Sequence, residues 1–230
     1  MKIAVIGGGI FGVTTALILS TNHSVELFEK NSDILKAASG SNQYRVHRGY
    51  HYPRSKDTVI GIINSEQSFQ DMYSNAIENN YEHYYCISKT DSFTSPQQFL
   101  DFCNEFDLDF KKSEISCVNK DSVEFCLKVK ESLYDPEKLK ELSWKKLKEN
   151  NVKVNLNIKA GQEIFKNFDW VVVCTYSNLN SLIQNHPNLQ KEYQFEVCEK
   201  PVVKLPESFR NKSIVIMDGP FMCIDPLANT

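Results

Sequence analysis

The feature that most constrains the fold is a run of glycines near the N-terminus. The hexapeptide GGGIFG, residues 7–12, follows the apolar run of residues 2–6 and opens a segment with helical spacing. A second apolar run, residues 25–28, ends at the acidic Glu29. A strand, a glycine turn, a helix, a second strand and an acid follow one another in this order in dinucleotide-binding βαβ units. The sequence therefore predicts a Rossmann-like domain with a parallel sheet.

Each part of this motif has a physical role. The first glycine permits a tight turn, the second lets the backbone approach a pyrophosphate, and the third lets helix and strand pack closely. The helix N-terminus offers N–H groups to the phosphates, and Glu29 is placed to accept the hydroxyls of an adenosine ribose while repelling a 2′-phosphate. These features predict NAD or FAD rather than NADP. The expected dinucleotide-binding residues here are Gly7, Gly9, Ile10, Phe11, Gly12, Glu29 and Lys30.

The middle of the chain reads as a mixture of helices and extended segments. Helical spacing covers residues 56–77, and residues 81–89 are aromatic and extended. Ser95, Pro96 and Gln98 form the signature of a capping box, which predicts a helix running to about Phe106. Two short strands are expected within residues 113–129.

The second half continues with a helix that Asp135 and Pro136 cap. Leu139, Leu142 and Leu147 are expected to face inward from this helix. Strands are expected at 152–158, at 170–175 as a fully buried strand, at 195–205 and at 213–217. The last two are typical of a mostly antiparallel sheet.

This order predicts an α/β fold in which a mostly antiparallel α+β substrate domain interrupts the nucleotide-binding domain. The expected nucleotide-binding domain comprises residues 1–80 and 131–185, and the expected substrate domain comprises residues 81–130 and 186–230. The chain is thus predicted to visit each domain twice.

Composition narrows the function classes. The formal charge of −3 and the pI near 6.0 give no overall attraction to nucleic acid or anionic membranes. No apolar run approaches the roughly 20 residues that span a bilayer, so no transmembrane segment is expected. The seven cysteines are scattered without a C-x-x-C pair. This pattern favours reduced thiols in a cytoplasmic protein and predicts no metal site.

A second conspicuous stretch is NQYRVHRGYHYPRS, residues 42–55. It contains three of the four arginines, two of the five histidines and three of the ten tyrosines. An arginine binds a carboxylate through two parallel hydrogen bonds, which a lysine does not. Arg45 and His47 alternate, as do Tyr50 and Tyr52, so in an extended loop each pair faces one side.

Together with the glycine motif, this region resembles the D-amino-acid-oxidase-like family of FAD-dependent oxidoreductases. The resemblance rests on Ser39-Gly40-Ser41-Asn42, which matches a small-residue loop of that family, and on His47-Arg48-Gly49. The resemblance implies FAD as cofactor, with Ser39, Asn42, Gln43 and, after a late strand, Thr175 among its contacts. Family members continue well beyond this length, so a C-terminally truncated fragment is expected.

The resemblance also implies a reaction, hydride transfer from a small amino acid, amine or 2-hydroxy acid to flavin N5. A substrate carrying a carboxylate would be held by Arg45, with His47 as a base and Tyr50 as a further catalytic residue. Tyr52 and Arg54 are additional candidates for the substrate side, although ion pairs are the alternative for Arg48 and Arg54. In some relatives a histidine of this loop binds the flavin covalently, and His47 is the corresponding candidate.

Three other functions remain open at this stage. An NAD-dependent dehydrogenase shares the glycine motif but predicts a regular second βαβ unit directly after Glu29. A nucleic-acid-binding module would explain interleaved arginines and tyrosines, but the net negative charge opposes it, so no nucleic-acid partner is expected. A protein that binds flavin without turnover is the third. The sequence leaves the substrate, the electron acceptor and the oligomeric state undetermined.

Overall fold

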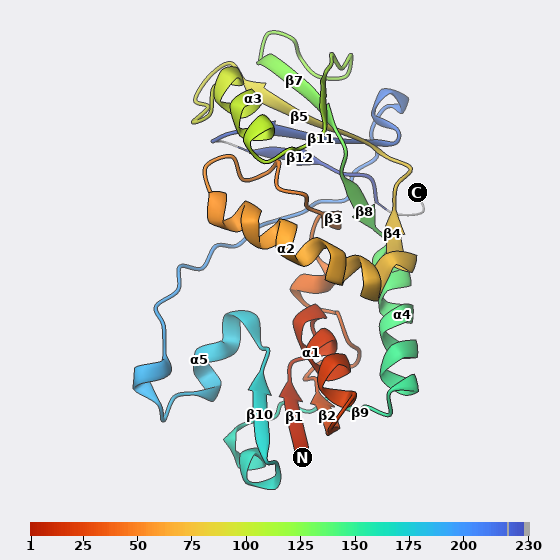
Figure 1. Cartoon of the computed structure of the whole chain (residues 1–230), viewed down its shortest axis with the longest axis vertical. Helices are drawn as coiled ribbons and strands as arrows, with labels where there is room; N and C mark the ends of the chain where they lie inside the picture. Colours follow the sequence, from red (N-terminus) through yellow and green to blue (C-terminus); the bar gives the residue numbers. More distant parts are fainter. Residues whose placement is uncertain (220, 228–230) are drawn as a thin grey trace. The chain divides into compact units, whose positions relative to one another are not determined.

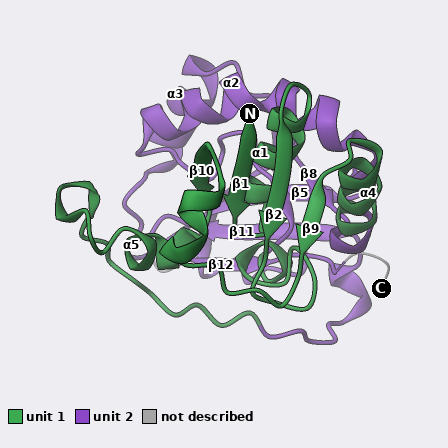
Figure 2. Ribbon diagram, turned by 90° about the horizontal axis from the view of Figure 1, so that it is seen from below, with its two compact units in different colours: residues 1–42, 139–200 green, residues 43–138, 201–230 purple. Residues whose placement is uncertain are grey.

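The apolar runs at the N-terminus form neighbouring parallel strands in the computed structural model, which describes residues 1–219 and 221–227. The chain divides into two compact units, each built from two segments (Figure 2). Unit 1 comprises residues 1–42 and 139–200, and unit 2 comprises residues 43–138 and 201–230. These boundaries differ from the predicted domain ranges, which remain a prediction about functional domains.

Unit 1 is built on a parallel sheet with the strand order β10-β1-β2-β9. Its strands are β1 (Lys2–Ile6), β2 (Ser24–Phe28), β9 (Lys153–Asn155) and β10 (Trp170–Val173). Helix α1 (Ile10–Ser20) joins β1 to β2 and contacts both strands (Figure 1). Helix α4 (Pro136–Glu149) enters the unit from unit 2, and α5 (Leu179–Leu182) follows β10.

The two central strands carry the core of unit 1. In β1 every residue from Ile3 to Ile6 is buried, as a strand with a parallel neighbour on each side requires. The prediction that 170–175 is a fully buried strand is wrong. Strand β10 stands at the edge of this sheet, its residues are partly or fully exposed, and Trp170 is 63% exposed.

The described residues of unit 2 form two sheets. The larger has the order β12-β11-β5-β7-β6, in which β5 and β11 are parallel and the other neighbours antiparallel. Its strands are β5 (Glu82–Ser88), β6 (Phe110–Lys112), β7 (Val123–Val129), β11 (Lys212–Met217) and β12 (Met222–Ile224). The smaller sheet joins β3 (Arg45–Val46), β8 (Ser132–Tyr134) and β4 (Ile77–Glu78).

Two helices belong to unit 2, α2 (Lys56–Tyr73) and α3 (Pro96–Glu105) (Figure 1). The capping box predicted for α3 is confirmed, because Ser95 Oγ accepts the Gln98 N–H and the Gln98 side chain accepts the Ser95 N–H. Phe99 and Phe102 of this helix pack into the main core of the unit together with Tyr50, Tyr85 and Leu127.

Several predicted bounds need correction. No strand forms at 195–205, where every residue is exposed and none has a strand partner. Helix α2 ends at Tyr73 rather than at residue 77, because Ile77 pairs with Tyr134 in a sheet. In α4, Leu139 and Leu147 are buried as expected, but Leu142 is only partly buried and Ser143 is buried beside it. Among the described residues, no helix combines the length and apolar character needed to cross a bilayer.

Candidate functional site

The glycine turn of unit 1 is packed so tightly that two of its glycines tolerate no side chain. Gly7 has φ +108°, and a Cβ atom there would lie 2.4 Å from the carbonyl oxygen of Cys174. A Cβ atom at Gly12 would lie 1.7 Å from the carbonyl oxygen of Gly7. Gly7 and Gly12 therefore hold the turn, helix α1 and the end of β10 together, as the motif predicts.

Gly9 differs, because its outer side is open. A Cβ atom there would meet only Ser39 Oγ, at 3.4 Å, and its φ of −72° suits any residue. Ser39 Oγ accepts the N–H of Ile10, the first residue of α1, at 3.0 Å. The small-residue loop predicted to lie along a pyrophosphate thus reaches the N-terminus of α1. This open backbone beside a helix N-terminus is the place where a phosphate group fits.

Glu29 lies against the same turn. Its Oε2 accepts the Gly8 N–H at 2.6 Å and its Oε1 accepts the Asn31 N–H at 2.8 Å. The side chain is fixed in this position and the residue is only 7% exposed. A carboxylate oxygen that accepts one hydrogen bond keeps capacity for another, so Glu29 fits a ribose hydroxyl donor.

Other predicted cofactor residues take different positions. Thr175 lies two residues beyond the end of β10, and its buried Oγ1 has no hydrogen-bond partner among the described residues. Asn42 donates from its side-chain amide to the carbonyls of Ala38 and Ser39, which stabilises the loop itself. Phe11 is 78% exposed and Lys30 is exposed, whereas Gln43 is the first residue of unit 2. The turn, Ser39, Glu29 and the unpaired Thr175 hydroxyl together fit the adenosine diphosphate part of a dinucleotide.

In unit 2, Arg45 is the centre of a buried polar network. Its guanidinium forms ion pairs with Glu131 and, at 2.7 Å, with Asp225. It also donates to Ser213 Oγ at 2.5 Å and to Tyr85 Oη at 3.1 Å. The Arg45 side chain is 2% exposed, and that of Glu131 is fully buried.

Within this network, Glu131 and Arg45 shift each other's pKa toward the charged form. Burial opposes the ionisation of Glu131, but the charges of Arg45 and His47 outweigh it, so the pKa of Glu131 falls well below its usual range. Burial also opposes the charge on Arg45, yet Tyr85, Glu131 and Asp225 raise the Arg45 pKa above its ordinary value. The role of substrate-carboxylate binding stays a prediction for Arg45, which already faces two carboxylates.

His47 lies at the partly exposed border of this network. Its Nδ1 is 3.6 Å from Glu131 Oε1, and its side chain is 28% exposed. The rings of His51 and Tyr52 lie next to it, with centroids 5.2 and 5.5 Å from the His47 ring. His51 also stacks on Phe221 at 5.1 Å. Burial first, and then the charges of His47 and Arg45, lower the pKa of His51 to about 4, which keeps its ring neutral near pH 7.

Three further residues of the stretch 42–55, Tyr50, Arg54 and Arg48, form hydrogen bonds or ion pairs with other residues of the chain. Tyr50 is fully buried and donates its hydroxyl to the carbonyl of Asp109 at 2.6 Å, so its catalytic role stays a prediction. Arg54 forms two hydrogen bonds with the buried carboxylate of Asp218, which Thr94 also contacts. Arg48 forms an ion pair with Glu66 at 3.1 Å.

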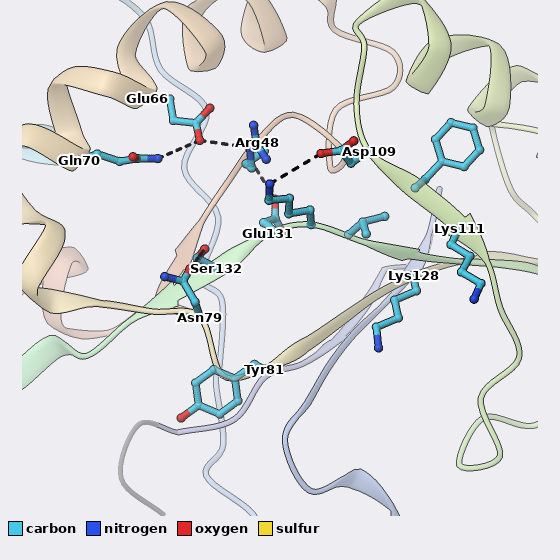
Figure 3. Close-up of a pocket in the computed structure, with 13 residues that line it drawn as sticks. Arg48, Glu66, Gln70, Asn79, Tyr81, Asp109, Lys111, Lys128, Glu131 and Ser132 are labelled. Carbon is cyan, nitrogen blue, oxygen red and sulfur yellow. Dashed lines mark hydrogen bonds and ion pairs between the residues drawn. The ribbon is translucent and has the colours of Figure 1, made fainter.

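A cavity of about 540 Å³ opens beside this stretch (Figure 3). Arg48 points toward Glu66 there, and Gln70 donates to the same carboxylate. Glu131 lines the cavity as well, while Lys130 lies 3.9 Å from Asp109. Both cations and acids line the cavity, so it has no single charge for a ligand to match.

Sequence reasoning missed the acids that organise this site. Glu131 and Asp225 lie 86 and 180 residues from Arg45 along the chain. No local pattern marks either residue, and only the pairing of β3 with β8 brings Glu131 to Arg45 and His47. A buried arginine requires acidic partners, so Arg45, which pairs with both acids, is the one signal that could have pointed to them.

Comparison with known proteins adds three findings. The sequence model of the family described as "FAD dependent oxidoreductase" matches residues 2–106. A protein named FAD-dependent monooxygenase kojA, from Aspergillus flavus, is 32% identical over 111 residues, which are 46% of this chain and 26% of that protein. The chain therefore spans about a quarter of this curated relative.

Solved structures agree on the fold. Glycine oxidase from Geobacillus kaustophilus matches with a TM-score of 0.61 and 10% identity over 80% of this chain and 58% of its own. NikD, described as an unusual amino acid oxidase, matches with a TM-score of 0.59 and 12% identity over 80% of this chain and 53% of its own. These similarities confirm the predicted α/β fold class, and the family match over residues 2–106 supports FAD as the cofactor type. Residues 2–106 thus resemble the FAD-dependent oxidoreductase family, the family that the sequence motifs predicted.

Proposed function

We propose that this chain is the FAD-binding part of an oxidoreductase that oxidises a small molecule at a CH–NH or CH–OH bond. The observation that carries the proposal is the open cradle formed by Gly9, Ser39 and Glu29 within a segment that matches FAD-dependent oxidoreductases. Bound FAD would supply a hydride acceptor. The protein's own residues would bind the cofactor, orient the substrate and hold a proton.

His47 is the residue best placed to take a proton from a substrate hydroxyl or ammonium group. Its ring is partly exposed, and its Nδ1 faces the buried Glu131 carboxylate. A carboxylate behind one ring nitrogen orients the imidazole, which leaves the other nitrogen for the substrate. The neutral His51 and Tyr52 rings beside it would provide an apolar wall for that substrate.

Arg45 takes part in a different way from the one its residue type first suggests. Two carboxylates already surround its guanidinium, and a third from a substrate would be repelled by both. We propose that Arg45 positions Glu131 and thereby His47. A substrate carboxylate would then be bound by other groups.

The names of the similar proteins suggest two types of reaction, oxidation and monooxygenation. Glycine oxidase and NikD are named as oxidases, whereas kojA is named a monooxygenase. Candidate substrates are therefore to be tested both for oxidation and for incorporation of labelled oxygen. Labelled oxygen in the organic product would favour the monooxygenase version.

A substitution at Gly9 tests the FAD cradle directly. Gly9→Ala adds one methyl group, which the protein accommodates at 3.4 Å from Ser39 Oγ but which projects into the space assigned to the pyrophosphate. We expect normal folding by circular dichroism and at least a roughly tenfold weaker affinity for FAD in a fluorescence titration, equivalent to about 1.4 kcal/mol. Gly61→Ala is the matched control, because no atom lies within 4 Å of a Cβ there. Unchanged FAD affinity in Gly9→Ala would remove the cradle from the proposal.

A further inference from the structure

A pair of thiols lies within the larger sheet of unit 2, outside the proposed site. Cys86 on β5 and Cys126 on β7 are directly opposite each other in the antiparallel register. Their sulfur atoms are 2.9 Å apart. No disulfide joins the seven cysteines, all of which lie within the described residues.

The backbone places this pair in the position that suits a cross-strand bridge. The carbonyl of Cys126 accepts the N–H of Ser113, on the side of β7 away from β5. In an antiparallel strand the N–H and C=O of one residue point to the same side, so Cys126 and Cys86 form a non-hydrogen-bonded pair. Such pairs have Cα atoms about 4.5 Å apart, within the roughly 4.4–6.8 Å range of disulfides.

The two thiols differ in accessibility. Cys86 is completely buried, whereas Cys126 is partly exposed. The hydrogen bond to Cys126, and then burial, raise the pKa of the Cys86 thiol far above its ordinary value. An oxidant from solution therefore meets Cys126 first, and Cys86 is the thiol that resolves the product.

We propose that Cys86 and Cys126 form a reversible disulfide when the protein meets hydrogen peroxide. The Cys126 thiol releases its proton, its sulfur attacks one peroxide oxygen and the O–O bond breaks; the leaving hydroxide takes up that proton as water, and Cys126 becomes a sulfenic acid. The Cys86 sulfur then attacks the Cys126 sulfur, the S–O bond breaks, and the leaving hydroxide takes the Cys86 proton as water. Two thiols are oxidised and one peroxide is reduced to two waters.

Peptide mapping tests this assignment, because trypsin separates the relevant cysteines. Cys86 falls in the peptide of residues 57–89, Cys117 in 113–120 and Cys126 in 121–128. The folded protein is treated with hydrogen peroxide, then denatured in the presence of N-ethylmaleimide so that every remaining thiol is alkylated, and digested without reductant. We expect loss of two of the seven alkylated thiols, a linked peptide joining 57–89 to 121–128, and return of both thiols after dithiothreitol.

The controls make the result specific. Cys117 belongs to the same apolar cluster as the pair, so Cys117→Ser should leave the linked peptide unchanged, whereas Cys126→Ser should abolish every link to Cys86. If a variant fails to fold, the peptide map of the wild-type protein alone tests whether Cys86 and Cys126 are linked. A link between Cys117 and Cys126, a link found only between two chains, or over-oxidised Cys126 with unmodified Cys86 would overturn the proposal.

Discussion

Arg45 joins two acids from distant parts of the chain in one buried network. Its substitution by alanine leaves Glu131 and Asp225 as buried acids without their cation. Removing one partner of a buried ion pair costs about 3–5 kcal/mol, so we expect Arg45→Ala to lower the free energy of unfolding by that amount in urea denaturation. Arg210→Ala is the control, because Arg210 and its partner Glu207 are 71% and 80% exposed. An Arg45→Ala protein as stable as this control would show that the network is not structural.

His83 makes a second prediction at the residue scale, about acid stability. The residue is 1% exposed, and neither ring nitrogen has a hydrogen-bond partner in the described part of the chain. Burial, followed by the charge of Arg45, lowers its pKa to about 4. The unfolded chain therefore takes up this proton first as the pH falls below about 6.5, and stability is lost between there and about pH 4, by up to roughly 3 kcal/mol.

His83→Phe should flatten this part of the pH profile, because phenylalanine fills the space and does not titrate. The check is the urea midpoint of both proteins at several pH values between 4 and 7. His51 has a similarly lowered pKa, so part of the pH dependence should remain. Glu131 affects stability mainly below this window. Its pKa is lowered in the folded protein, so the unfolded chain takes up that proton first, and stability is lost as the pH falls from about 4.5 toward the lower folded value. Identical slopes in the two proteins would contradict the assignment to His83.

At the element scale, the sequence predicted features that neighbouring residues determine and missed those that depend on contacts between distant segments. The capping box of α3 was predicted at single-residue accuracy because Ser95 and Gln98 satisfy each other's backbone within one turn. Two other features could not be predicted in this way, the edge position of β10 and the absence of a strand at 195–205. Both depend on which strands pair in the folded protein. The same reason hid Glu131, which reaches His47 only through β-sheet pairing.

The cap itself is open to a direct measurement. Ser95→Ala removes the acceptor of the Gln98 N–H and should lower the free energy of unfolding by about 1 kcal/mol. Ser65 provides the matched control within α2, where its hydroxyl only donates back to helix carbonyls at an exposed site. Ser65→Ala should therefore change stability little or raise it slightly, since alanine is the better helix former. Equal losses in both variants would mean that the cap contributes nothing of its own.

At the scale of the whole molecule, each unit consists of two separate chain segments, and this predicts where proteolysis begins. Residues 190–206 join unit 1 to the last segment of unit 2; all are exposed and none lies in a helix or strand. Trypsin should cut the native protein first after Lys191 and Lys204, because Lys200 precedes a proline. The released C-terminal piece contains β11, which pairs with β5 over six residues and with β12. A piece held in this way should stay bound after cleavage.

We expect limited trypsin digestion to give two main fragments that separate in denaturing electrophoresis but elute together in native size-exclusion chromatography. A double variant, Lys191→Gln with Lys204→Gln, should resist the first cuts while keeping its unfolding transition, because both side chains are exposed. Early cleavage inside α4 or β7 would contradict this order of stability. Loss of the C-terminal fragment under native conditions would show that the β5–β11 pairing is too weak to complete the sheet, and that unit 2 depends on chain continuity through residues 190–206.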